Sequence, residues 1–297
     1  MGGVAGGRLA AAVSAAGALG MIGMGSAGSA VALERELPYV HEVSASFGIG
    51  LVDWVASAHP QLLDAAIAAQ PRLISISFGE DLSWVERVRA AGIITATQVY
   101  DDVDARRAAD AGVEVLVARG TEGGGHGAPR MATLPLLDTV LSAVSVPVLA
   151  AGGIGSAATL AAVLAAGASG AWLGTCLAAC SESLLSPRAR QAMVAAQGTD
   201  TTVTRVFDIG MELPWPSKFP ARVLRNEFSA RWSGREPELA QNSRAKKELA
   251  AAVIGDQPRV APVDAGQGVG MVIDIEPAGL AIERLCAGAA QLLPSNR

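Results

Sequence analysis

The sequence is poor in the residues that build metal sites, disulfide frameworks and nucleic-acid interfaces. Its three cysteines, Cys176, Cys180 and Cys286, form no metal-ligand pattern with any histidine. We therefore expect no metal site, and we interpret Cys176 and Cys180 as reduced core residues of a cytoplasmic protein. Charged residues make up 17% of the chain and the net charge is −5, so the basic surface that nucleic-acid binding requires is missing.

Aromatic residues are also scarce, at 4%, whereas glycine (34 residues) and alanine are abundant. This composition suits helices packed tightly on a sheet and does not suit disorder. A chain of 297 residues can form one large α/β domain or two smaller ones around a substantial core. The apolar fraction of 51% is compatible with a homo-oligomer.

Long apolar runs are missing except near the start of the chain. Arg8 and the apolar and small residues that follow it, up to residue 30, imitate a secretory signal. Four glycines interrupt residues 17–25, and the same pattern recurs later in the chain, so we expect a helix and a strand of the folded domain here. No other run approaches the roughly 20 residues of a membrane span, and we expect no membrane partner.

A recurring pattern places a helix, an Ala-Gly pair and a short buried strand in succession. The glycines are Gly17, Gly92, Gly112 and Gly167. A glycine just past a helix end is a left-handed cap, and a strand directly after it is typical of a parallel α/β unit. The pattern and the other apolar runs predict seven strands, near residues 20, 48, 75, 96, 116, 148 and 172, and helices over 61–69, 82–91, 101–111, 134–144 and 157–166.

This alternation is typical of a parallel barrel or of a doubly wound sheet. The barrel is favoured because glycines and polar residues recur at the strand ends, as they must when every strand end faces one central site. We therefore predict an α/β fold, a (β/α)8 TIM barrel that lacks its first strand. That strand is expected before Met1, because the chain opens with a glycine-rich segment and then enters a helix.

The pattern changes after Cys180. Residues 183–260 carry many prolines and charges, and only residues 201–207 read as a strand. We predict a smaller, mostly helical, substrate-side domain over residues 183–262. The barrel domain would then comprise residues 1–182 and 263–297, with residues 269–275 and a helix over 277–293 as the return of the chain.

Chemistry is expected at the glycine-rich loop 120–127, which follows a buried strand and contains a single histidine, His126. Its three consecutive glycines allow backbone N–H groups to approach a phosphate or a flat ring closely. Two further glycine-rich strand ends, 151–155 and 173–175, precede helix N-termini, which attract phosphate. The chain has no Walker A lysine and no acidic residue suitably placed for a dinucleotide, so a flavin tail is favoured.

The segments 120–127, 146–154 and 167–175 resemble, in order and spacing, the nitronate monooxygenase family, formerly called 2-nitropropane dioxygenases. Residues 265–270 resemble the C-terminal return of that family, and residues 219–228 resemble its helical substrate domain. The resemblance implies a barrel that holds FMN, with His126 as the catalytic base. The cofactor-binding residues that it implies are Gly124 beside the flavin, Gly152 and Gly153 at the phosphate, and Trp172, Leu173, Gly174 and Thr175 on the other side of the phosphate.

The implied reaction converts an alkyl nitronate and O2 to a carbonyl compound and nitrite. A neutral nitroalkane would first lose a Cα proton to His126. Two positions depart from the family pattern: Gly50 stands where an asparagine usually faces the flavin, and Arg119 stands where glutamine is frequent. An arginine near the flavin would favour negative charge, either on the reduced cofactor or on an anionic substrate.

Two alternatives remain open from the sequence. A flavin-dependent enoyl-acyl-carrier-protein reductase has a nearly identical loop and histidine, but it takes hydride from NAD(P)H. A degenerate barrel that serves as an interaction subunit is the other alternative, motivated by Gly50 and by the missing first strand.

Overall fold

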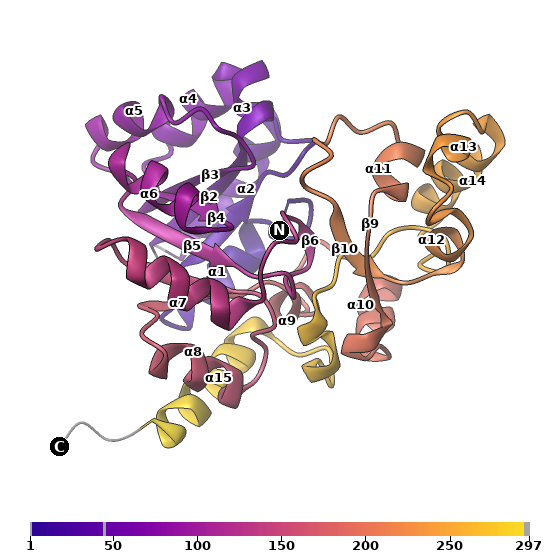
Figure 1. The fold of residues 1–297 in the computed structure, drawn as a ribbon. Coiled ribbons are helices and arrows are strands. Elements are labelled where there is room, and N and C mark those ends of the chain that lie inside the picture. Colours follow the sequence, from indigo (N-terminus) through magenta and orange to yellow (C-terminus); the bar gives the residue numbers. More distant parts are fainter. Residues whose placement is uncertain (1, 44–45, 294–297) are drawn as a thin grey trace.

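The computed structural model describes residues 2–43 and 46–293. A seven-stranded parallel sheet, curled and surrounded by helices, forms the larger part of the molecule, and a lobe with a small antiparallel sheet lies beside it (Figure 1). The strand order of the large sheet follows the sequence, and each strand is parallel to its neighbours. Its strands are β1 Gly20–Gly23, β2 Phe47–Val52, β3 Leu73–Ser77, β4 Ile94–Val99, β5 Val115–Arg119, β7 Val148–Ala151 and β8 Gly170–Trp172.

All seven predicted strands are therefore confirmed. Their apolar character follows from burial on both faces, as parallel strands require. Ile49 and Ile74 are completely buried, and every residue of β3 is buried. The four glycines predicted to cap helix ends all have a positive φ, between +73° and +102°, which only glycine adopts without strain.

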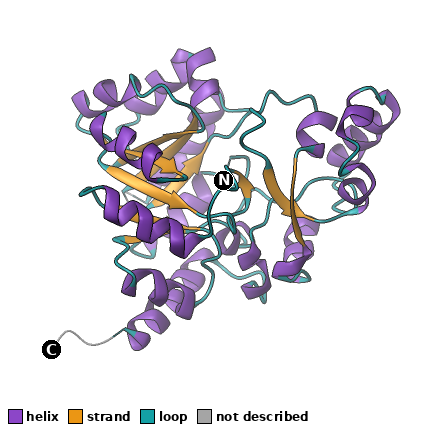
Figure 2. Cartoon of the chain, in the orientation of Figure 1, coloured by secondary structure: helices purple, strands orange, loops and turns teal. Residues whose placement is uncertain are grey.

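Helices cover the outer face of the curled sheet, with strands inside, as Figure 2 shows by colour. Side-chain caps fix several helix starts: Ser29, Asp101 and Ser156 each accept a hydrogen bond from the backbone of the first turn. The five predicted helices are confirmed as α4 to α8. The helices of this part are α1 Gly7–Ala15, α2 Ala30–Glu42, α3 Asp53–Ala58, α4 Pro60–Ala68, α5 Trp84–Ala90, α6 Asp102–Asp110, α7 Thr133–Ala143, α8 Ala157–Ala165, α9 Thr175–Ala178 and α15 Ala278–Leu292.

The beginning of the chain forms α1 and β1, as predicted for this segment. Within the described residues, β1 and β8 are the two edges of the sheet and do not pair with each other. The segment before α1 lies at the β1 edge instead, where the N–H of Gly23 donates to the carbonyl of Ala5 at 2.8 Å. No helix in the described part of the chain is both long enough and apolar enough to cross a membrane.

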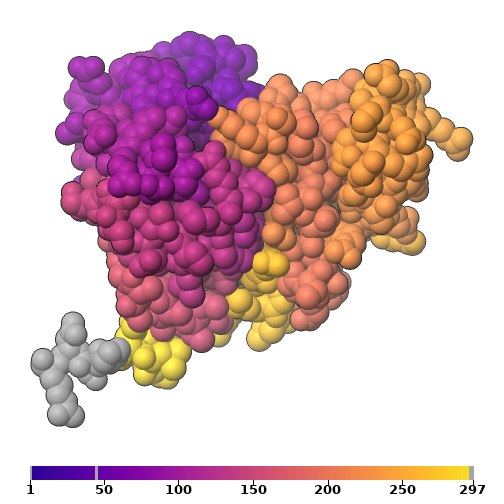
Figure 3. Space-filling view, viewed as in Figure 1, coloured from indigo at the N-terminus to yellow at the C-terminus, as the bar shows by residue number. Residues whose placement is uncertain are grey.

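The lobe contains residues that follow α9, drawn in orange in Figures 1 and 3. Its antiparallel sheet has the order β6 (Gly125–His126), β10 (Ala221–Leu224) and β9 (Thr201–Thr204). A separate apolar cluster that includes Phe207, Phe228 and Trp232 forms its core. Its helices are α10 Pro187–Val194, α11 Val206–Gly210, α12 Glu227–Trp232, α13 Glu236–Ala240 and α14 Ser243–Ile254.

Two short strands of this antiparallel sheet were not predicted from the sequence. The segment 219–228 contains β10, which is too short for its alternation of buried and partly exposed residues to stand out in the sequence. In the glycine-rich loop, Gly125 and His126 form β6, because β10 supplies a hydrogen-bonding partner that the sequence does not reveal. The helix predicted over 277–293 is present as α15 and packs against α1 and α8.

The cysteines give a direct check on this packing. Burial raises the pKa of the Cys176 thiol to about 11 and that of Cys180 to about 12, whereas Cys286 is exposed. We expect native protein at mildly alkaline pH to show one fast-reacting thiol, because Cys180 is buried, Cys176 is only partly exposed, and the raised pKa values keep both thiols protonated. A colorimetric thiol titration checks this: Cys286→Ser should remove the fast phase, and denaturant should expose the remaining thiols. Rapid reaction of a second thiol in native protein would contradict the packing.

Candidate active site

The register of the large sheet brings one set of side chains to the same face, at the carboxyl ends of the strands. Gly50 is opposite Ser75, Gln98 is opposite Val117, and Arg119 is opposite Ala151, which in turn is opposite Trp172. Because alternate residues of a strand point to opposite faces, these residues share the concave side. All of them except Val117 line a pocket of about 310 Å³ at the mouth of the curled sheet.

Most of the predicted cofactor-binding residues line this pocket. It collects residues from β2, from the ends of β5, β7 and β8, and from the loops that follow them. The predicted residues found there are Gly50, Arg119, Gly124, His126, Gly152, Gly153, Trp172, Gly174 and Thr175. Leu173 is the exception, because it follows Trp172 in the chain and its side chain packs against the hydrophobic core instead.

Glycine at Gly124 and Gly152 is demanded by close packing. A Cβ on Gly124 would lie 2.5 Å from the backbone nitrogen of Gly266, and a Cβ on Gly152 would lie 2.8 Å from Oγ1 of Thr133. Gly152 also has a φ of +110°. Gly50 differs, because no neighbouring atom lies within 3.9 Å of the position that its Cβ would take. Its missing side chain leaves room in the pocket.

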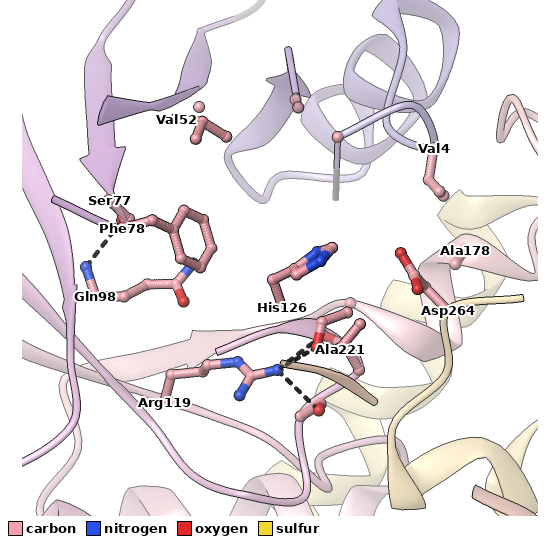
Figure 4. Close-up of a pocket in the computed structure, with 18 of the residues that line it drawn as sticks. Val4, Val52, Ser77, Phe78, Gln98, Arg119, His126, Ala178, Ala221 and Asp264 are labelled. Carbon is pink, nitrogen blue, oxygen red and sulfur yellow. Dashed lines mark hydrogen bonds between the residues drawn. The ribbon is translucent and has the colours of Figure 1, made fainter. Parts of the chain in front are cut away.

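Arg119, at the end of β5, binds the backbone of the glycine-rich loop that follows it. Its Nη2 donates to the carbonyl oxygens of Gly123, Gly124 and Gly125 at 2.9 to 3.0 Å, as Figure 4 shows. The side chain is buried, and this burial lowers the pKa of the guanidinium, while Tyr100, Asp264 and Glu122 act in the opposite direction. The arginine therefore fixes three carbonyl groups of a loop that has few side chains of its own.

The other end of the loop is tied to α7. The carboxylate of Glu122 accepts hydrogen bonds from the backbone nitrogen of Thr133 at 3.0 Å and from its hydroxyl at 2.9 Å. This acidic cap satisfies the first turn of α7 and suits the positive end of its dipole. With Arg119 at one end and Glu122 at the other, the loop is held as a rigid platform for His126.

His126 projects from β6 into the pocket and meets two residues of the lobe. Its Nε2 lies 2.9 Å from Oδ1 of Asp208, which belongs to α11 and is buried. Its ring stacks on the indole of Trp215, with ring centroids 3.6 Å apart and an interplanar angle of 8°. Trp215 is packed edge-on against Trp54 and Phe78. The hydrogen bond to Asp208 therefore fixes the imidazole within the plane of its ring, and the stacking on Trp215 fixes it perpendicular to that plane.

A second carboxyl, Asp264, faces the same pocket (Figure 4). Desolvation by the surrounding protein raises the pKa of Asp264, although its side chain is exposed on the pocket side. Asp208 adds to this increase, whereas His126 and Arg119 oppose it. The wall beyond His126 is apolar and is formed by Phe78, Leu213 and Trp215.

The sequence pointed to His126 but not to its partners. Asp208 and Asp264 lie 82 and 138 residues beyond His126, and nothing in their local sequence marks them as functional. Trp215 stands between two prolines and reads only as a turn. The available signals were polar residues in buried strands, Ser75, Ser77 and Gln98, which do line the pocket.

Comparison with known proteins agrees with the sequence resemblance. A sequence profile of the nitronate monooxygenase family matches residues 54–288. The chain belongs to the nitronate monooxygenase family. Members of this family are flavin-dependent oxidoreductases, as the resemblance implied, and the prediction of a TIM-barrel-like fold is confirmed by the solved structures described next.

Two solved structures resemble nearly the whole chain. FabK from Thermotoga maritima superposes with a TM-score of 0.85 at 28% identity, covering 98% of this chain and 92% of that protein. A nitroalkane oxidase from Streptomyces ansochromogenes gives a TM-score of 0.80 at 29% identity, covering 98% of this chain and 93% of that protein.

Curated relatives match over shorter stretches. A nitronate monooxygenase of Paraburkholderia phytofirmans is 31% identical over 193 residues, which are 62% of this chain and 50% of the relative. A (3aS,4S,5R,7aS)-5-hydroxy-7a-methyl-1-oxo-octahydro-1H-indene-4-carboxyl-CoA dehydrogenase of Rhodococcus jostii is 34% identical over 173 residues, 58% of this chain and 46% of the relative. These matches span about half the length of the curated relatives.

Replacing Arg119 tests whether its hydrogen bonds to the glycine-rich loop stabilise the protein. We expect Arg119→Gln to lower the free energy of unfolding by about 3 kcal/mol, because loop carbonyls would lose a charged donor in a buried place. The matched control is Arg106→Gln, which removes an exposed ion pair with Asp102 on α6 and should cost no more than about 1 kcal/mol. Urea denaturation measures both. Equal stability of the two variants would show that the loop does not depend on Arg119.

Proposed function

We propose that the chain binds FMN in this pocket and oxidises alkyl nitronates or nitroalkanes with O2 to a carbonyl compound and nitrite. The observation that carries the proposal is the position of His126. It projects from the glycine-rich loop into a pocket whose rim is made of the glycines that follow β5, β7 and β8. Family membership and the likeness to a nitroalkane oxidase support the same reaction class.

The pocket suits a flat cofactor with a phosphate tail. Glycines from several strand ends leave backbone groups uncovered, and the open space at Gly50 is on the same side of the sheet. Gly152, Gly153 and Gly174 would hold the phosphate, and Gly124 would lie against the ring. Gly174 precedes α9 without a side-chain cap, so the first N–H groups of that helix have no capping side chain.

When bound, FMN would supply the redox chemistry of the oxidation. The residues of the chain bind the substrate, orient it and remove its proton. His126 removes the Cα proton of a neutral nitroalkane, and the electron pair of that C–H bond moves onto the nitro group to form the nitronate. Phe78, Leu213 and Trp215 exclude water from the apolar part of the substrate.

A second candidate is an NAD(P)H-dependent reductase of the enoyl-thioester type. The apolar wall of the pocket and the likeness to the carboxyl-CoA dehydrogenase of Rhodococcus jostii favour it as the runner-up. The two reactions use different electron donors, so one experiment separates them. An interaction subunit without a cofactor is the third possibility that this experiment tests.

Absorbance spectra of the purified protein decide among these functions. We expect a bound flavin whose spectrum changes on anaerobic addition of a short alkyl nitronate and does not change with NADH, and we expect nitrite to form once O2 is admitted. Bleaching by NADH without a response to nitronate would establish the reductase instead. A colourless protein that takes up no added FMN would overturn both enzymatic functions.

The glycine positions provide a test of cofactor placement. We expect Gly124→Ala to weaken FMN binding by roughly tenfold or more, because its Cβ would collide with the backbone at Gly266 and displace the loop. Gly50→Ala is the matched control, since its Cβ meets open space and should leave the melting temperature unchanged. Fluorescence titration with FMN and thermal melts measure the two effects. Unaltered FMN affinity in Gly124→Ala would place the ring elsewhere.

A further inference from the structure

The contact between His126 and Asp208 joins two parts of the molecule that are distant in sequence. His126 comes from the loop after β5, and Asp208 comes from α11 of the lobe, 82 residues later. The exposed fractions of the two side chains are only 14% and 5%. A hydrogen bond of 2.9 Å in such a place is shielded from water and therefore has a well-defined geometry.

This contact selects one tautomer of the imidazole. An ionised carboxylate can only accept a hydrogen bond, so the Nε2 that faces Asp208 must carry the hydrogen. In neutral His126 the lone pair is then on Nδ1. A base that takes a proton from a substrate must use the nitrogen with the lone pair, and the contact thereby decides which nitrogen of His126 is reactive.

The second oxygen of Asp208 points to the same conclusion. Oδ2 is buried and has no hydrogen-bond partner among the described residues. A buried carboxylate with one hydrogen bond is costly unless its partner can become positively charged. His126 is that partner, and the imidazolium produced by proton abstraction would neutralise the carboxylate. Trp215 prevents the ring from turning away from this pairing.

We infer that Asp208 is a positioning residue for His126: it holds the hydrogen on Nε2, leaves Nδ1 as the proton acceptor and stabilises the imidazolium. The inference rests on the proposed function in taking His126 as the base. In the step, the Cα–H bond of the nitroalkane breaks, its electron pair moves onto the nitro group and its proton goes to Nδ1. Electrons are only redistributed within the substrate, so no oxidant takes part.

Other charged groups lie near the same histidine, and their effects on it must be distinguished from the effect of Asp208. Asp264 and Arg119 both interact electrostatically within this pocket. No hydrogen bond joins either side chain to His126 in the described part of the chain. Their charges can shift the proton equilibrium of the site, but only a hydrogen-bonded acceptor fixes the tautomer.

The first experiment compares two substrates in the FMN-loaded enzyme. A nitroalkane needs the base, whereas a nitronate prepared beforehand does not. We expect Asp208→Asn to lower kcat/KM for the nitroalkane by about 10²-fold or more while changing that for the nitronate by less than about threefold. Equal losses with both substrates would indicate a merely structural role and overturn the inference, as would full activity with the nitroalkane.

The second experiment needs no enzymatic activity. Nitrogen-15 NMR of histidine-labelled protein distinguishes the two tautomers, and the chain has only three histidines, so His126→Asn assigns the signal. We expect the Nε2–H tautomer in the wild type and in Asp264→Asn, and its loss in Asp208→Asn. An Nδ1–H tautomer in the wild type would overturn the inference. Wild-type protein that turns over neither substrate would refute the proposed function, while the NMR result would still decide the role of Asp208.

Discussion

The site depends on the pairing of the glycine-rich loop with β10. In this short ladder His126 is opposite Ala221, and Gly125 is opposite Arg222. The ladder anchors a loop of the barrel to a strand of the lobe, so that both parts line one pocket. Arg119 and Glu122 hold the loop on its barrel side, and this pairing sets the position of His126 relative to Asp208 and Trp215 in the lobe. A few backbone hydrogen bonds therefore determine the position of the proposed base.

Support for this loop comes from polar groups rather than from its own side chains. Arg119 binds three consecutive carbonyl oxygens, and Glu122 caps α7 through Thr133. Gly124 lies directly against Gly266, from the segment that precedes α15. Functional loops on parallel barrels work when a rigid scaffold holds them, and here the scaffold includes parts of the chain from both sides of the lobe. Arg119, which departs from the family pattern, therefore has a structural role, because it binds the carbonyl groups of the loop.

The barrel supplies His126 and the glycine-rich strand ends, and the second part of the chain adds charged and bulky side chains around the histidine. Asp208 and Asp264 bring two carboxyls near one imidazole, and Trp215 covers one face of its ring. Gly50, the other departure from the family pattern, leaves space where a side chain would otherwise enter the pocket. Together these features give a pocket in which a single histidine is held by the lobe and faced by the glycine-rich strand ends.

The sequence by itself determined the barrel and its glycine-rich strand ends. Parallel strands are buried on both faces, and helix ends need left-handed glycines, so the seven strands, the four glycine caps and the position of His126 could all be read locally. The sequence did not reveal β6, β10, Asp208 or Trp215, nor that the side chain of Leu173 packs against the core. Short strands and buried acids carry no periodic signal, since their roles depend on partners distant in the chain. Only the tertiary structure decided which residues stand around the histidine, because that arrangement follows from backbone pairing between the loop and the lobe.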